Sequence, residues 1–142
     1  MLQVPAPGGK KRPTRKGAAI LEFAIVAPLI FLFVLGLIEI SRGLMVTHLL
    51  TGAARKGCRL AVIEGKSNDD VTAAVNATLG PAGISSDSIT VLVNDKPADA
   101  STAGASDEIT VLVSVPVSAV TWVPTSNFLT GSLSGQYTLR RE

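Results

Sequence analysis

The side chains that most often carry chemistry are scarce in this 142-residue sequence. His48 is the only histidine and Cys58 the only cysteine, and they lie ten residues apart with no phosphate loop or dinucleotide fingerprint nearby. We expect His48 to have no ligand role, because no second metal-binding side chain lies at a workable spacing. Cys58 lies among small and apolar residues and is expected to be a packing residue, with an interchain disulfide as the alternative. The sequence therefore predicts a non-enzyme without a metal or cofactor.

One carboxylate lies in an unusual place. The stretch "RKGAAILEFAIVAPLIFLFVLGLIEI" runs from Arg15 to Ile40, and Glu22 is its only charge between Lys16 and Glu39. A membrane-spanning helix needs about 20 apolar residues, so the stretch predicts one. A charge at the centre of such a helix costs about 2.5–3.5 kcal/mol, and less near the membrane surface, where we expect Glu22.

Two interpretations of Glu22 follow from that cost. In the first, its side chain simply extends to the cytoplasmic headgroups. In the second, proteolysis after Gly17 frees an α-amino group at Ala18, about one helical turn away, and this amine or that of a neighbouring subunit pairs with the carboxylate.

The charge distribution predicts the orientation. Five cations precede Glu22, which places the N-terminus in the cytoplasm by the positive-inside rule. Without residues 1–17 the net charge is −3, and no basic face remains that would bind nucleic acid. A secretory signal cut near 41–43 is a less favoured alternative, since the apolar stretch exceeds the usual ~7–15 residues.

The motif "KGAAILEF" resembles the class III signal peptides that prepilin peptidases cut. Together with "LEFAIVAPLIFLFVLGLIEISRG", "LLTGAARKGCRLAV" and "YTLRRE", it resembles the TadE-like minor pseudopilins of the tight-adherence (Flp) pilus system. The resemblance implies cleavage between Gly17 and Ala18 and a role for Glu22 and Phe23 in subunit assembly and registration. It implies as partners the prepilin peptidase, other minor pseudopilins and the major pilin, besides the lipid bilayer.

Beyond the membrane segment the helix is expected to continue to about Glu64. Pro28 predicts a kink or a short melted turn at 24–28. Ala53, Gly57 and Ala61 recur four residues apart and form a face on which a helix can pack closely. This face could accept another subunit's helix or the protein's own sheet, and the sequence does not decide between them.

The remainder predicts a small outer domain. Capping residues before "VTAAVNATLG" predict a short helix over 69–79 with a buried stripe of Val71, Val75 and Leu79. The pentapeptide "ITVLV" occurs at 89–93 and again at 109–113, and its β-branched residues predict two strands of one hairpin. The polar segment between them is expected to be an exposed, mobile loop.

After Pro116, which is expected to end or bend the second strand, an irregular crossing anchored by Trp122 and Phe128 leads to a third strand in "GQYTLRR". About 75 residues are few for an independent core, so the helix extension should help to hold the domain. The predicted fold class is α+β, divided into a leader (1–17), a transmembrane helix (18–40), a helix extension (41–65) and a small extracytoplasmic domain (66–142).

Two functions follow as expectations. The favoured one is a minor pseudopilin of the inner membrane, trimmed after Gly17, that takes part in pilus assembly, with its outer domain in the periplasm. The alternative is a signal-anchored periplasmic binding or accessory module that is never processed.

Overall fold

This computed structural model describes residues 15–121 and 131–142. The chain divides into two compact units, Met1–Leu37 and Ile38–Glu142, and each is described separately below. A long N-terminal helix is followed by a short helix and a four-stranded antiparallel sheet, which confirms the predicted α+β class.

Helix α1 runs from Arg15 to Ala61, a length of 47 residues. It ends three residues before the predicted Glu64. The helix continues through Pro28 without interruption, so the melted turn that we considered at this proline is absent. Proline removes a single N–H donor, and the hydrogen-bonded turns on either side hold the backbone in place.

The first unit exposes the apolar side chains of α1. Phe23, Phe31 and Phe33 are each about 70% exposed. The helix contains a stretch long and apolar enough to cross a membrane, and none of that stretch is buried against the protein. A soluble core helix would cover such a surface, so these side chains suit a lipid environment and suggest a membrane anchor.

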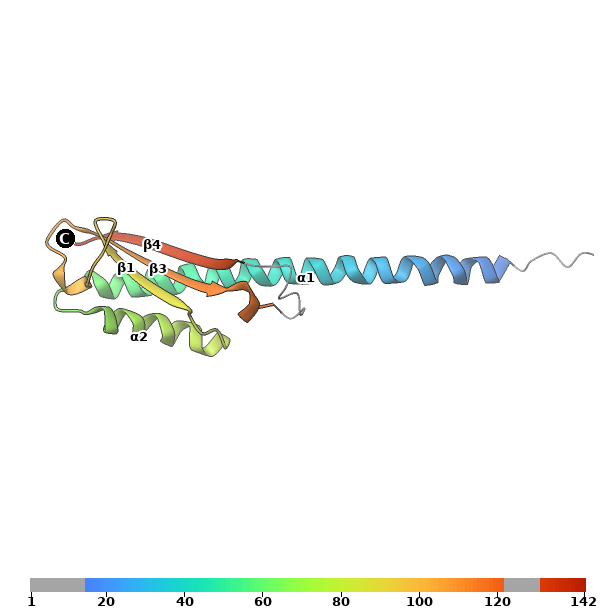
Figure 1. The fold of residues 1–142 in the computed structure, drawn as a ribbon, viewed down its shortest axis with the longest axis horizontal. Coiled ribbons are helices and arrows are strands. Elements are labelled where there is room, and N and C mark those ends of the chain that lie inside the picture. Colours follow the sequence, from blue (N-terminus) through green and yellow to red (C-terminus); the bar gives the residue numbers. More distant parts are fainter. Residues whose placement is uncertain (1–14, 122–130) are drawn as a thin grey trace, which may run out of the picture. The chain divides into compact units, whose positions relative to one another are not determined.

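The second unit is built around an antiparallel sheet with strand order β2-β1-β3-β4, in which β2 is Lys96–Pro97 and β4 is Ser132–Arg140 (Figure 1). Strand β1 (Ser88–Val93) and strand β3 (Glu108–Pro116) contain the two "ITVLV" copies. The copies pair with each other in opposite directions, with Val91 opposite Val111 at the centre. Both predicted strands and their pairing are confirmed, since β-branched residues suit neighbouring positions of one sheet.

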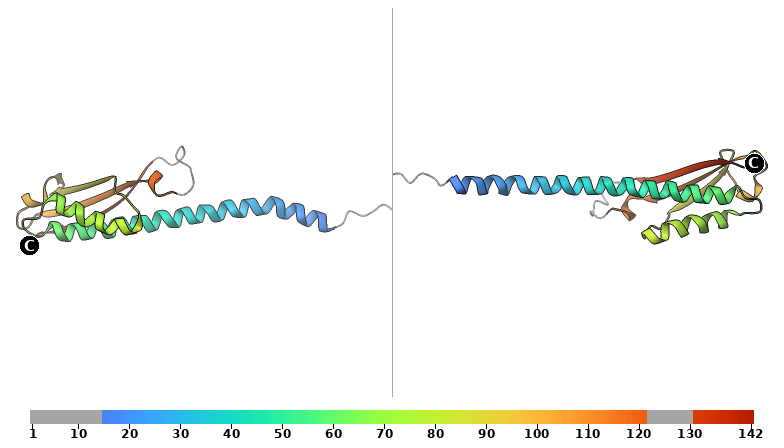
Figure 2. Two further views of the ribbon diagram at one scale, coloured as in Figure 1. Left: turned by 90° about the horizontal axis from the view of Figure 1, so that it is seen from below. Right: turned by 180° about the vertical axis from the view of Figure 1, so that it is seen from behind.

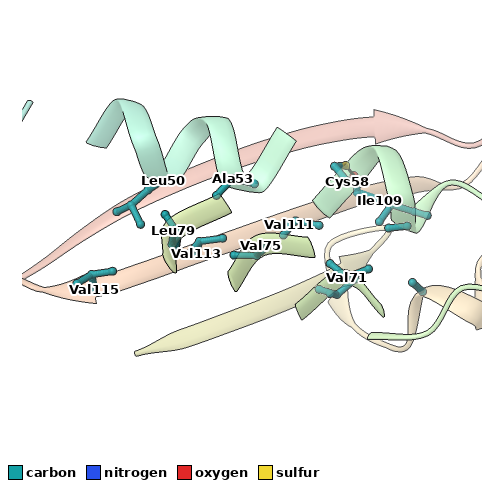
Figure 3. Packing of buried hydrophobic residues seen from close by; sticks show 14 of the residues in the cluster. Leu50, Ala53, Cys58, Val71, Val75, Leu79, Ile109, Val111, Val113 and Val115 are labelled. Atoms are coloured by element: carbon teal, nitrogen blue, oxygen red, sulfur yellow. Dashed lines mark hydrogen bonds between the residues drawn. The ribbon is translucent and has the colours of Figure 1, made fainter. Parts of the chain in front are cut away.

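Helix α2 and the second half of α1 cover one face of this sheet (Figure 2). The core lies between them, and Figure 3 shows side chains of both helices directed at the central strand β3. The largest fully buried side chains are Leu50, Val71, Val75, Leu79, Ile109, Val111, Val113, Val115 and Cys58. Each buried aliphatic side chain contributes roughly 1.5–3 kcal/mol. The expectation that the helix extension helps to hold the domain is therefore confirmed.

Helix α2 (Asn68–Leu79) begins and ends close to the predicted residues. Ser67 is its N-cap residue, and the Asp70 carboxylate accepts a hydrogen bond from the Ser67 backbone N–H at 3.2 Å. An acidic group in the first turn also favours the helix dipole. Its buried stripe is the predicted one, Val71, Val75 and Leu79.

The segment between β1 and β3 is more structured than we expected. Asn94 and Asp95 have φ values of 50° and 63° and turn the chain into the short strand β2 (Lys96–Pro97). A 3₁₀ turn, η2 (Ala100–Thr102), follows. The Asn68 side chain of α2 donates to the Ala98 carbonyl at 3.1 Å and accepts from the Ala100 N–H at 2.9 Å. Most of the segment is exposed, as predicted, but Ala100 and Ala103 are buried and these bonds hold the segment against α2.

Strand β3 ends at Pro116, as predicted, and a 3₁₀ turn, η3 (Val117–Ala119), follows. Another 3₁₀ turn, η1 (Gly80–Ala82), follows α2. The predicted third strand is β4 (Ser132–Arg140), which pairs with β3 along its whole length. The predicted anchors Trp122 and Phe128 lie outside the described residues.

Candidate functional site

The predicted cleavage position lies in the first turns of α1. Gly17 and Ala18 are both exposed, and a Cβ added at Gly17 would meet no atom within 4 Å. The first turn of a helix has the fewest internal hydrogen bonds and is the easiest to unwind. Since neither backbone conformation nor packing requires glycine at this position, the fold gives no reason for the residue.

Glu22 and Phe23 lie on the exposed surface of the same helix. Phe23 is 73% exposed, and the neighbouring Ile20 and Leu21 are 70% and 64% exposed. Ala18 and Glu22 are four residues apart, so they lie on one side of the helix with a rise of about 6 Å between them. An amine at Ala18 would therefore be within reach of the Glu22 carboxylate.

The small-residue face of α1 packs inside the protein's own second unit. Ala53 and Ala61 have no exposed surface. A Cβ added at Gly57 would lie 2.9 Å from a Val75 methyl group and 3.2 Å from a Val71 methyl group, both on α2. Of the two alternatives for this face, the structure shows the internal one, so these residues are not available to a helix of another subunit.

A second close approach joins α1 to strand β4 at Gly135. A Cβ at this position would lie 2.4 Å from the Thr51 backbone nitrogen and 2.5 Å from the Leu50 carbonyl carbon. Both contacts are with helix backbone, which no side-chain rotation can relieve. Gly135 thus lets the strand cross directly over the helix, a role that the sequence analysis did not identify.

The end of α1 is held by a buried arginine. Arg141 is 4% exposed. Its guanidinium donates to the backbone carbonyls of Ala61, Val62 and Ile63 at 3.1 Å each, and also to the Ala103 carbonyl. The last carbonyls of a helix have no partner within the helix, and a cation near them also favours the helix dipole. Arg141 therefore caps α1 from a position about 80 residues later in the chain.

Cys58 is a buried packing residue, as predicted, and His48 lies on the surface. Cys58 is buried, its Sγ donates to the Ile109 carbonyl at 3.1 Å, and burial raises the pKa of its thiol. A raised thiol pKa lowers the fraction of reactive thiolate. His48 is exposed, and the described residues contain no cluster of three or more His, Cys, Asp or Glu side chains that could hold a metal ion.

Two charged residues at the start of the second unit contact the chain after η3. Arg42 donates through Nε to the Val120 carbonyl, and the Glu39 carboxylate accepts a hydrogen bond from the Thr121 hydroxyl at 3.2 Å. A pocket of about 180 Å³ lies here, and its walls are mostly apolar. The sequence analysis missed these contacts because the partners are about 80 residues apart in the chain.

These features define a protein whose N-terminal helix is long and apolar enough to cross a membrane and forms, with its second half, part of the core of a small α+β domain. Residues 17–59 match the sequence model of the TadE-like protein family, which confirms the resemblance identified from the sequence. The match begins at Gly17, covers less than a third of the chain and lies entirely in α1. No curated protein and no solved structure matches this chain.

Proposed function

We propose that this protein is a minor pseudopilin that takes part in the assembly of a tight-adherence (Flp) pilus after a prepilin peptidase has cut it behind Gly17. The observation that carries the proposal is the TadE-like match, which begins at Gly17 and continues through the apolar helix. The described residues also offer no cluster that could bind a metal ion. In this role the chain is the substrate of a protease and a structural subunit.

The orientation follows from the charges. The leader residues 1–17 carry five cations, and the apolar helix follows directly. By the positive-inside rule the leader lies in the cytoplasm and the α+β domain lies in the periplasm, with the helix in the inner membrane. The cleavage position then lies at the cytoplasmic face, where a prepilin peptidase would act.

The environment of Gly17 supports processing. Glycine in a helix costs up to about 1 kcal/mol relative to alanine, and packing does not compensate for it at this exposed position. A glycine is useful where another molecule must approach the backbone closely. We infer that the other molecule is the peptidase.

Glu22 is proposed to register the subunit in the assembly. Cleavage leaves an α-amino group at Ala18, which can carry a positive charge. This amine, or the same group of a neighbouring subunit, neutralises Glu22 in the low dielectric of the membrane. Phe23 begins the apolar surface that follows.

Contacts with sister subunits are proposed to use the exposed part of α1. The face formed by Ala53, Gly57 and Ala61 is occupied by the protein's own α2 and sheet. The large apolar side chains of residues 20–37 remain exposed and can pack against the helices of the major pilin and of other minor pseudopilins.

Intact-protein mass spectrometry of the membrane-extracted protein tests the processing. We expect the loss of residues 1–17 in cells that contain the peptidase. Gly17→Val should block this loss, whereas Gly36→Val, at another glycine of α1 where a Cβ meets nothing within 4 Å, should leave it intact. Full-length protein that stays in the membrane of such cells and never enters pili would refute the proposal in favour of an unprocessed, signal-anchored accessory module.

The role of Glu22 needs a separate experiment. Glu22→Gln keeps the shape of the side chain and removes its charge, so we expect normal membrane insertion and strongly reduced surface pili. Glu64→Gln, at an exposed carboxylate of the second unit, is the matched control and should leave pili unchanged. Normal piliation of Glu22→Gln would contradict the charge pairing without bearing on the cleavage.

A further inference from the structure

The second unit has an apolar rim at the end where α1 enters it. The exposed residues of this proximal rim come from three elements: Ile40, Leu44 and Met45 of α1, Pro81 and Ala82 of η1, and Ala119 of η3. Ile40, Leu44 and Met45 are each at least 60% exposed. Among the described residues after position 45, Ile63 is the only large apolar side chain with comparable exposure.

The three elements of the proximal rim lie at one end of the unit. Met45 and Ala82 line the same groove of about 170 Å³, together with Leu49 and Ile84. Ile40 lines the neighbouring pocket together with Val117 of η3, and Arg42 lines both cavities. The ribbon shows the turn after α2 and the turn after β3 at the same end of the sheet (Figure 1).

Charged side chains are concentrated at the opposite end. There β1 turns into β2, Glu108 lies opposite Arg140 in neighbouring strands, and Arg141 caps the end of α1. Near the proximal rim the described charged residues are Glu39, Arg42 and Asp87. The side chains of Glu39 and Arg42 bond to Thr121 and Val120 of the same unit. The apolar surface is thus interrupted by few charges.

We propose that the proximal rim rests in the headgroup layer of a lipid bilayer, so that the α+β domain sits directly on the membrane. The apolar stretch of α1 ends at about Ile40, just before Ser41 and Arg42. From Ile40 to Met45 the helix rises about 8 Å. This rise is close to the thickness of the polar layer of one leaflet, about 5–8 Å. Leu44 and Met45 therefore lie at headgroup depth, and η1 and η3 lie beside them.

Lipid is the partner that the sequence favours for the proximal rim, because the rim directly follows the predicted membrane helix. In the sequence the proximal rim follows the apolar stretch of α1 directly, and only Ser41, Arg42 and Gly43 separate Ile40 from Leu44. Interfacial surfaces of this kind bury apolar side chains about 5–10 Å into the headgroup and acyl boundary. The proposal depends on the membrane anchor and does not depend on cleavage or on pilus assembly.

The test uses the full chain in nanodiscs of phosphatidylcholine and phosphatidylglycerol, with Cys58→Ala as the background. Nitroxide labels are placed singly at Ala82→Cys and Ala119→Cys on the proximal rim, and at Ser106→Cys at the opposite end as the control. All three positions are exposed. Power-saturation spectroscopy compares collisions of each label with oxygen, which is enriched in lipid, and with a water-soluble nickel chelate.

We expect the ratio of oxygen to nickel accessibility to be several-fold higher at Ala82 and Ala119 than at Ser106. Equal ratios at all three positions would overturn the proposal, because the domain would then stand clear of the membrane. Labels on the rim that are shielded from both reagents would also overturn it, because another protein surface would then cover the rim.

A second pair of variants keeps the test independent of labelling at the turns. With the label at Met45→Cys, the substitution Ala82→Asp places a charge on the proximal rim and should lower the oxygen-to-nickel ratio several-fold. Ser106→Asp should leave it unchanged. An unchanged ratio in Ala82→Asp would contradict the proposal, while circular dichroism confirms that both variants are folded. Intact mass, measured on the same samples, reports the processing separately.

Discussion

Gly135→Ala is the sharpest perturbation of the contact between α1 and β4. The added Cβ would lie 2.4 Å from the Thr51 nitrogen and 2.5 Å from the Leu50 carbonyl carbon, whereas an ordinary contact begins at 3.4 Å. Helix and strand must therefore separate locally by about 1 Å. Leu50 is fully buried at this point, so the separation loosens the packing around it.

The expected cost is about 3 kcal/mol. Inserting a methyl group into a packed core typically costs about 1–3 kcal/mol, and the upper end applies because the obstacle is rigid backbone. A gap of about 1 Å also removes a quarter to a half of the dispersion attraction between the atoms on its two sides. At 1.4 kcal/mol per factor of ten, this cost means that the domain should open about 100-fold more often than in the unsubstituted protein.

The single cysteine provides the assay. Cys58 is buried between α1 and the sheet, so a thiol reagent can react with it only when the domain opens. The rate of labelling in the full chain, relative to a short unfolded peptide, gives the free energy of opening. Gly131→Ala is the matched control, since a Cβ there meets nothing within 4 Å. If Gly135→Ala and Gly131→Ala are labelled at rates within about threefold of each other, the reasoning fails.

Four further outcomes are expected. Gly52→Ala should slow thiol labelling and stabilise the domain by roughly 0.5–1 kcal/mol, because an added Cβ meets nothing within 4 Å in the middle of α1. Gly57→Ala should destabilise the domain by roughly 1–2 kcal/mol in the same assay, because the added Cβ would lie 2.9 Å from a methyl group of the fully buried Val75 and the gain in helix propensity offsets only part of this. Arg141→Met should destabilise the domain by about 2–4 kcal/mol, because it leaves buried carbonyls without a donor. Arg141→Lys should restore only part of the lost stability, since an ammonium group cannot reach all four carbonyls. Hydrogen bonds from Ser101 lower the pKa of Asp99, and hydrogen bonds from Asn94 and from the Gly104 backbone lower the pKa of Asp107. Because the folded-state pKa is the lower one, both groups stabilise the fold above their unfolded pKa of about 4, and this is lost as the pH falls below that value. Thermal unfolding of an Asp99→Asn and Asp107→Asn double variant, followed by circular dichroism, should therefore depend less on pH in this acidic range.

Local patterns were sufficient to predict the main elements. The capping residues and the stripe of Val71, Val75 and Leu79 predicted α2, because a helix of this length is determined by its ends and its buried face. The two "ITVLV" copies predicted β1 and β3, since β-branched runs have few other structures available to them.

The partner of the small-residue face could not be predicted in the same way. Ala53, Gly57 and Ala61 permit close packing, but the pattern is the same whether the neighbour belongs to the same chain or to another. The structure decides it, because the methyl groups of Val71 and Val75 fill the space beside Gly57.

Contacts between distant parts of the chain gave no signal. Arg141 binds backbone carbonyls, and every residue offers a carbonyl, so the sequence does not mark which ones it will reach. In the sequence, Gly135 resembles any glycine that weakens a strand. Its role becomes clear only from the close contact of β4 with the backbone of α1. The order of the loop between β1 and β3 was missed for the same reason, since Asn68, which holds it, lies about 30 residues earlier.

The cap that Arg141 places on α1 has a consequence for synthesis. The carbonyls of Ala61, Val62 and Ile63 emerge from the ribosome about 80 residues before the guanidinium that satisfies them. In the meantime water must solvate them, and the end of the helix can fray. Arg141 follows every strand of the sheet in the chain. Its hydrogen bonds to the end of α1 can therefore form only after β4 has been translated and has paired with β3. A chain that stops before that point would leave the end of α1 without its cap.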